Sequence, residues 1–216
     1  SPEPLGVVRP VDIRPEEAEN RPPVARTWGR VVDWRAQLID QLDWHWQNQL
    51  RPRLDGLTDD EYLWEPVQGC WSIRPRGEAV SADPRGAGDY VIDWEHPAPD
   101  PSPVTTIAWR IGHISIPVLG ARAANHFGRG GVSAATTDWS PRAVDGLALL
   151  DHHYDQWTQG LRSLSLEGLE APCGPAEGPF ASEPFAALVL HINREVIHHG
   201  AEVALLRDLY RAEFGD

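Results

Sequence analysis

The chain has 216 residues, enough for one well-buried core and short for two, and its 32 acidic against 19 basic residues give a formal net charge of −13. So negative a chain repels phosphate backbones and anionic lipid, so we expect neither nucleic acid nor a membrane as its partner. All 19 basic residues are arginines, which excludes Schiff-base lysine catalysis and the P-loop lysine.

The cysteines and the apolar runs bear on the compartment. Cys70 and Cys173 are far apart, and no basic and apolar signal segment opens the sequence, so we expect a reduced, cytoplasmic protein. No apolar run approaches the ~18 residues that a membrane span needs. No base lies next to Cys70 in the sequence, which favours a buried structural thiol over a nucleophile.

The first third of the chain predicts an arm, two helices and an insertion. Proline-rich, acidic residues 1–25 predict an extended N-terminal arm before a single domain over 26–216. Apolar residues at helical spacing predict an amphipathic helix from about 28 to 50 that Pro52 ends. A capping box at 58–61 opens a short helix closed by Pro66. Residues 72–103 lose this periodicity and predict a long irregular insertion with one short strand near 89–94.

Three more long helices follow. The second begins with Thr105 or Thr106 as its cap and ends at Gly128, and Pro117 should kink it beside His113. The third is predicted from a cap at Ser140 to about 164. The last has Ser182 as its cap, Pro184 in its first turn, and a pattern that continues to about 210. The fold class is therefore all-α, a four-helix bundle with long crossover loops.

The last helix carries the residue types of a metal site. Glu195 and His199 are four residues apart, which places both side chains on one helix face about one turn apart. His113 on the second long helix is the best third ligand, beside a small Gly112 that would let another helix approach. Two histidines and one carboxylate with open positions suit zinc, iron(II), nickel or manganese. His191 is also four residues from Glu195 and remains a rival ligand.

Alternatives stand beside this prediction. A glutamate and a histidine at helical spacing often form only a surface pair, and a lone histidine in an apolar helix is usually a core residue. The other histidines and several tryptophans have weaker assignments. We expect His198 to contact a metal ligand without binding the metal, or to lie on the surface. His45 and His126 should cap or pack, and His152 and His153 should be solvated. Three tryptophans are expected to line a pocket: Trp64, Trp71 and Trp109.

Two segments carry a family resemblance. Trp109-Arg110-Ile111-Gly112-His113 and Arg194-Glu195-Val196-Ile197-His198-His199-Gly200 resemble the DinB-like four-helix bundles, over most of residues 28–212. That family includes mycothiol-dependent maleylpyruvate isomerases and thiol S-transferases that use mycothiol, bacillithiol or glutathione. The resemblance implies a divalent metal held by His113, Glu195 and His199. A glutamate at 195, where many members have histidine, favours the isomerase branch.

The resemblance also implies an activity. A metal-dependent enzyme would bind a low-molecular-weight thiol as thiolate and present it to a small electrophilic substrate, with Glu195, Arg110 and Arg194 as catalytic candidates. The two arginines could anchor a carboxylate or serve only in salt bridges. We expect the thiol in a pocket roofed by the 72–103 insertion, with Trp71 or Trp109 in its walls. A metal-binding stress or ligand-binding protein without turnover and a metal-dependent hydrolase remain alternatives, and a homodimer is compatible with the sequence.

Overall fold

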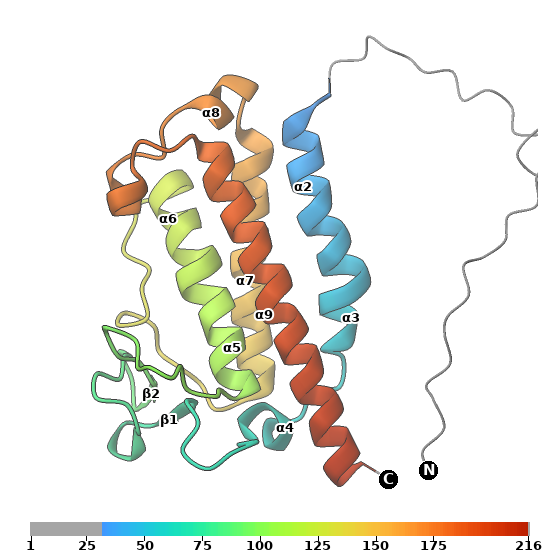
Figure 1. The fold of residues 1–216 in the computed structure, drawn as a ribbon, viewed down its shortest axis with the longest axis vertical. Helices are drawn as coiled ribbons and strands as arrows, with labels where there is room; N and C mark the ends of the chain where they lie inside the picture. The colour runs from blue at the N-terminus through green and yellow to red at the C-terminus, as the bar shows by residue number, and fades with distance from the viewer. Residues whose placement is uncertain (1–31, 216) are drawn as a thin grey trace, which may run out of the picture. The chain divides into compact units, whose positions relative to one another are not determined.

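Four long helical stretches make up most of the computed structural model, which describes residues 32–215 (Figure 1). α9 packs against α2 and α5, while α7 packs against α2, α5 and α6, so the four stretches enclose one core. The predicted all-α bundle is confirmed. The stretches are α2 Trp34–His45 with η1 Trp46–Leu50 and α3 Arg51–Arg53, α5 Ile107–His113 with η3 Ile114–Gly120 and α6 Ala121–Phe127, α7 Ala143–Ser163, and α9 Phe185–Phe214.

Short elements connect these helices. α4 Asp59–Leu63 follows the first stretch, and α8 Leu166–Glu170 and η4 Pro175–Phe180 lie between α7 and α9. In the insertion, β1 Ile73–Pro75 pairs antiparallel with β2 Tyr90–Ile92, and η2 Arg76–Glu78 follows β1. The strand expected near 89–94 is therefore confirmed, and its partner β1 is an addition to the prediction.

A buried carboxylate organises the rest of the insertion. Asp93 is fully buried and accepts hydrogen bonds from the backbone of Ser72, Val80 and Ser81 at 2.9–3.1 Å, and from Arg74 Nε at 3.1 Å. Its backbone carbonyl accepts from Trp109 Nε1 at 2.8 Å. The insertion is thus fastened to the start of α5 with little regular secondary structure.

The first helix begins later and ends later than predicted. Asp33 caps α2 by accepting from the Ala36 N–H at 3.0 Å, and Trp34, one of the apolar residues at helical spacing, is 65% exposed. The chain stays helical through Pro52 because the preceding residues form a π-helical stretch, in which the Arg51 N–H bonds to the Trp46 carbonyl. Part of the predicted start, residues 28–31, lies outside the described residues.

The second stretch contains the predicted cap and the predicted proline distortion. Thr106 accepts from the Trp109 N–H at 3.2 Å, and Gly128 ends the stretch. Pro117 lies in the π-helical segment η3, where the Ala121 N–H bonds to the Ile116 carbonyl. This widened segment begins directly after His113, and such segments are frequent near functional sites.

Two predicted serine caps are wrong. The Ala143 N–H at the start of α7 is bound by Asp59 Oδ1 at 2.7 Å, and the Ser140 hydroxyl accepts from the Arg142 N–H. α9 begins at Phe185 without a side-chain cap, so Ser182 does not cap it. At α7, a carboxylate from α4 satisfies an N–H group that a local serine was expected to bind.

The described part of the chain forms one compact unit from Asp33 onward. None of its helices is both long and apolar enough to cross a membrane. The predicted N-terminal arm, residues 1–25, lies outside the described residues.

Candidate metal centre

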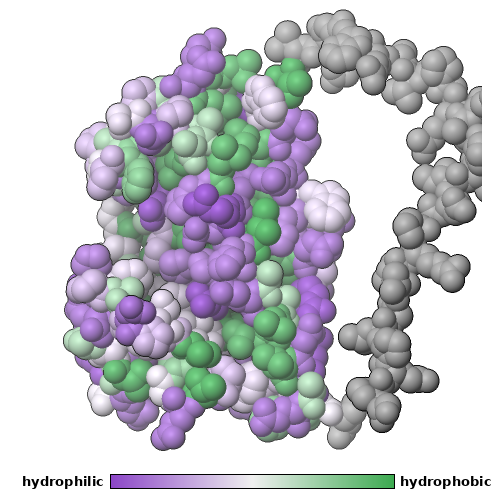
Figure 2. Space-filling view, in the orientation of Figure 1, coloured by the Kyte–Doolittle hydropathy of each residue, from purple (hydrophilic) through white to green (hydrophobic). Residues whose placement is uncertain are grey.

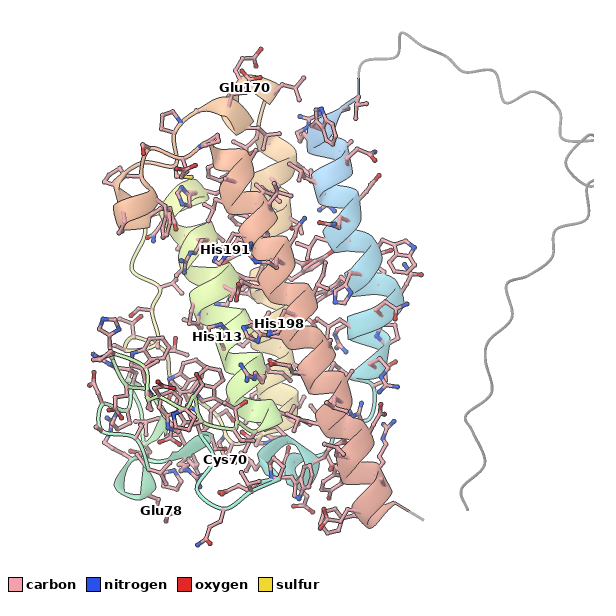
Figure 3. All side chains as sticks on the ribbon, in the orientation of Figure 1. Cys70, Glu78, His113, Glu170, His191 and His198 are labelled. Carbon is pink, nitrogen blue, oxygen red and sulfur yellow. The ribbon has the colours of Figure 1, made fainter. Side chains whose placement is uncertain are left out.

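Three partly or fully buried side chains from α5 and α9 converge where these two helices pack together, and Figure 3 labels His113 on α5 next to α9. His113, Glu195 and His199 each offer one ligand atom, and the three atoms lie within 4.8 Å of one another. His199 Nε2 is 3.2 Å from Glu195 Oε2. The rings of His113 and His199 meet edge to face, with centroids 4.7 Å apart. The structure thus brings together the three residues that the sequence singled out.

His113 has the character of a ligand. Its ring stacks on Trp109 at 5.1 Å, and its Nδ1 is buried without a hydrogen-bond partner among the described residues. Burial, together with smaller contributions from His199 and Arg110 nearby, lowers the pKa of His113 to about 3. The ring is therefore neutral at pH 7 and keeps an unprotonated nitrogen, as metal ligation requires.

Glu195 supplies the negative charge of the set. Its carboxylate lies between His199, the Nδ1 of His191 at 3.6 Å and the Nε of Arg194 at 3.9 Å. Two imidazoles and one carboxylate match the ligand chemistry of zinc and related divalent ions and leave coordination positions open. The three residues therefore form a candidate metal site that fits such an ion.

The rival histidines differ in position. His191 is half-buried and lies 2.8 Å from Arg194 Nη2, beside Glu195 but outside the convergent set. His198 is exposed and 3.4 Å from Glu202. The ligand atoms of His198, His199 and Glu202 also lie within 4.8 Å of one another, so these residues form a second possible metal-binding set. That second set shares His199 and is the more exposed of the two.

The two catalytic arginine candidates have different surroundings. The Arg110 side chain is 19% exposed, and its Nε lies 3.0 Å from Glu202 Oε2. Its guanidinium also lies over the ring of Trp109 at 5.2 Å. The Arg194 side chain is 70% exposed, so it is the one with room to meet a ligand. Arg110 is held in a partly buried ion pair.

Two of the three tryptophans expected to line a pocket are core residues, and Trp64 is only partly buried. Trp71 and Trp109 are both buried and pack against each other at 5.9 Å. The ring of Trp109 stacks against the ring of His113 and does not face a cleft. Trp64 packs edge-on against Tyr210 and Phe214, at the far end of α9. The large aromatic side chains Trp71 and Trp109 therefore contribute buried apolar area to the core and do not form a pocket wall.

A cleft of about 330 Å³ lies along the first half of α9. His191 and Arg194 line its end next to Glu195, and Arg122, Cys173 and Leu188 line the rest with residues of η4. No residue of the 72–103 insertion lines this cleft, contrary to the expected roof. Arg122 had no signal in the sequence because its position depends on how α6 meets η4.

Figure 2 shows hydrophilic side chains gathered over the middle of α9, where Figure 3 labels His191 and His198. The volume of the cleft falls within the range of small-molecule sites. His191 and Arg194, which lie beside Glu195, line the cleft, whereas His113, Glu195 and His199 do not.

The remaining histidines and Gly112 lie outside the candidate metal site. His153 is buried and bonds to Gln156 at 3.0 Å, so the prediction of a solvated residue is wrong for it, whereas His152 is exposed. His126 packs as expected, 2.9 Å from Glu177, and His45 is half-buried. A Cβ on Gly112 would meet Ile92 and Trp139, so this glycine admits the insertion and the segment before α7 instead of another helix.

Both cysteines are buried and free. Burial raises the pKa of Cys70 to about 11, and burial also raises the pKa of Cys173. Cys70 is therefore a buried thiol, as predicted, and neither sulfur is an appreciable thiolate at neutral pH.

The comparisons with known proteins identify the family. The chain matches the family model of the DinB superfamily over residues 41–203, which includes His113, Glu195 and His199. Comparison with curated proteins and with solved structures gave no match. The match covers more than half of the chain and agrees with the helical bundle around the candidate site. The chain therefore belongs to the DinB superfamily.

Proposed function

We propose that this chain is a metal-dependent enzyme that uses a low-molecular-weight thiol on a small electrophilic substrate. The observation that carries the proposal is the convergence of His113, Glu195 and His199 within 4.8 Å, with a neutral His113 whose buried nitrogen has no partner among the described residues. Zinc suits this ligand set best, and iron, nickel and manganese also accept it. A divalent cation held there supplies Lewis acidity that lowers the pKa of a coordinated thiol.

The protein's own sulfurs do not serve as the nucleophile in this proposal. Thiolate is the reactive form of a thiol, and burial raises the pKa of both Cys70 and Cys173. A thiol that enters from solvent is free of this penalty. The proposal therefore assigns the nucleophile to a small-molecule thiol and leaves both cysteines outside the chemistry.

Residues of the cleft bind and orient the ligands. Arg194 has an exposed guanidinium next to Glu195, and its planar fork matches a carboxylate or another planar anion. Leu188 and Cys173 supply apolar wall, which excludes water from one side. His191 is hydrogen-bonded to Arg194 at 2.8 Å and limits where the guanidinium points. Glu195, with its negative charge, partly neutralises the cation that it would hold.

Metal analysis followed by calorimetry tests the proposal. Protein purified without chelator should contain about one equivalent of divalent metal, and the metal-loaded protein should bind one of mycothiol, bacillithiol or glutathione with a measurable heat. A Glu195→Gln variant is the matched control because it keeps the shape of the side chain and removes the charge. It should bind metal and thiol more weakly.

Three outcomes would contradict the proposal. Absence of metal binding by the wild-type protein would remove its basis. Metal binding with no heat from any of the three thiols would favour a metal-binding protein without thiol chemistry. Conversion of an ester or amide by the metal-loaded protein without added thiol would favour a hydrolase.

A further inference from the structure

Both ring nitrogens of His199 face carboxylates. Nε2 is 3.2 Å from Glu195 Oε2, on the side of the candidate metal site. Nδ1 is 2.7 Å from Glu202 Oε2, on the opposite side of the ring. His199 is itself buried, so its orientation is set by these neighbours and by packing, with little influence of solvent.

The shorter contact decides where the ring carries its proton. Two acceptors 2.7 Å apart repel each other, so a proton must lie between Nδ1 of His199 and the carboxylate of Glu202. Arg110 Nη1 is 3.2 Å from the same Nδ1, yet Arg110 has its own acceptor in Glu202, 3.0 Å from its Nε. Nδ1 is therefore a donor to Glu202, and Arg110 is a second donor to that carboxylate.

The same contacts join the two helices that carry the ligands. Arg110 is three residues before His113 on α5, and Glu202 is three residues after His199 on α9. Residues at this spacing lie on one helix face. The Arg110–Glu202 ion pair thus lies one turn from the meeting of His113 and His199, and it joins α5 and α9 beside the site.

We propose that Glu202, held by Arg110, is a positioning residue that keeps the proton of His199 on Nδ1 and leaves Nε2 as the metal-binding nitrogen. This inference rests on the metal site of the proposed function and adds a residue to it. It also changes the role of Arg110, which acts by holding Glu202 and is not assigned to bind the thiol or the substrate. Carboxylates that accept from ligating histidines serve this purpose in metal sites generally.

A competing arrangement uses the same residue differently. Glu202 could ligate a metal directly in the set with His198 and His199. His198 is exposed, and an ion held by both His199 Nδ1 and Glu202 would have to displace the 2.7 Å contact between them. The first set needs no such change, which favours the positioning role.

Zinc affinity, measured by competition with a chromophoric chelator, tests the proposal. Glu202→Leu should lower the affinity by about 10–100-fold, the usual effect of losing such a partner. Glu202→Gln keeps an acceptor for Nδ1–H and should lose less. Glu213→Leu, on the exposed end of α9, is the matched control and should bind as wild type does. Arg110→Met combined with Glu202→Leu should lose no more than Glu202→Leu alone.

Nitrogen NMR of the His199 ring gives a second readout that does not need metal. It should find a proton on Nδ1 in the metal-free wild-type protein and again after zinc loading. A proton on Nε2 alone, or unchanged zinc affinity in Glu202→Leu, would overturn the proposal. The proposal would also be overturned if Glu202→Leu lost zinc binding while His113→Ala kept it, because Glu202 would then be a metal ligand.

The two readouts separate this inference from the proposed function. If wild-type protein binds no zinc, the proposed function fails, and the ring proton of the metal-free protein still decides the role of Glu202. If zinc binds but Nδ1 carries no proton, only the positioning role fails. Glu202→Gln, which preserves size and polarity, covers the case in which Glu202→Leu does not fold.

Discussion

His113 and His199 meet edge to face at 4.7 Å and 89°, from helices that are far apart in the sequence. His113→Ala should lower zinc affinity by more than the roughly 10–100-fold that an outer partner costs, because it removes one of three ligands. His191→Ala, the rival histidine, is the control and should retain most of the affinity. Calorimetric titration of both variants checks this. Equal losses in both would place His191 among the ligands.

Removal of metal should leave the fold intact. Leu42, Ile114, Leu150 and Val196 are fully buried in a core that does not depend on the metal site. Chelator-treated protein should keep its helical circular dichroism, and its melting temperature should fall only by what loss of a bound ligand predicts. Cooperative unfolding at room temperature on chelation would show a structural ion instead of a catalytic one.

Native Cys70 should be slow to alkylate at pH 8. Burial raises its pKa to about 11, so only about one thiol in a thousand is thiolate at that pH. The thiolate is the reactive form, so the rate should rise tenfold per pH unit towards that pKa while the fold persists. Mass spectrometry after iodoacetamide treatment checks this against urea-denatured protein, in which both cysteines should react fast. Rapid labelling of native Cys70 at pH 8 would contradict its burial.

A buried ion pair should dominate the stability of the α4–α9 contact. Arg207 binds both oxygens of Glu61, at 2.6 and 2.9 Å, and both side chains are almost fully buried. Arg207→Met leaves the Glu61 charge buried and unpaired, and should lower the free energy of unfolding by about 3–5 kcal/mol. Urea denaturation measures this. Arg53→Met, which breaks the exposed pair with Asp208, is the control and should cost at most about 1 kcal/mol. Similar costs for both variants would refute this account.

Much of the fold could be predicted from local patterns. Thr58 and Thr106 cap their helices as predicted because a cap is a contact three residues along the chain. The other half of the capping box does not form as expected, since Glu61 pairs with Arg207 on α9. The cap predicted at the start of α7 fails for the same reason, because Asp59 of α4 accepts from the Ala143 N–H in place of the local Ser140. Predictions failed where a distant side chain replaced the local partner.

In the candidate site too, contacts within one helix could be predicted from the sequence, and contacts between distant helices could not. The Glu195 and His199 pair follows from the period of one helix, and the structure places His113 beside it. The contact between Arg110 and Glu202 and the cleft at Arg122 depend on how helices distant in sequence meet, which spacing does not encode. The abundance of tryptophan near the site predicts a pocket lining, which the structure does not show for Trp109. Trp109 instead packs beneath His113 and ties α5 to the insertion.

X-ray absorption at the zinc edge of the metal-loaded protein would show whether His113, Glu195 and His199 hold the ion. We expect one zinc per chain with two imidazole nitrogens and carboxylate oxygen at about 2.0–2.2 Å, and loss of one imidazole in His113→Ala. A sulfur neighbour near about 2.3 Å, or a spectrum unchanged by His113→Ala, would contradict it.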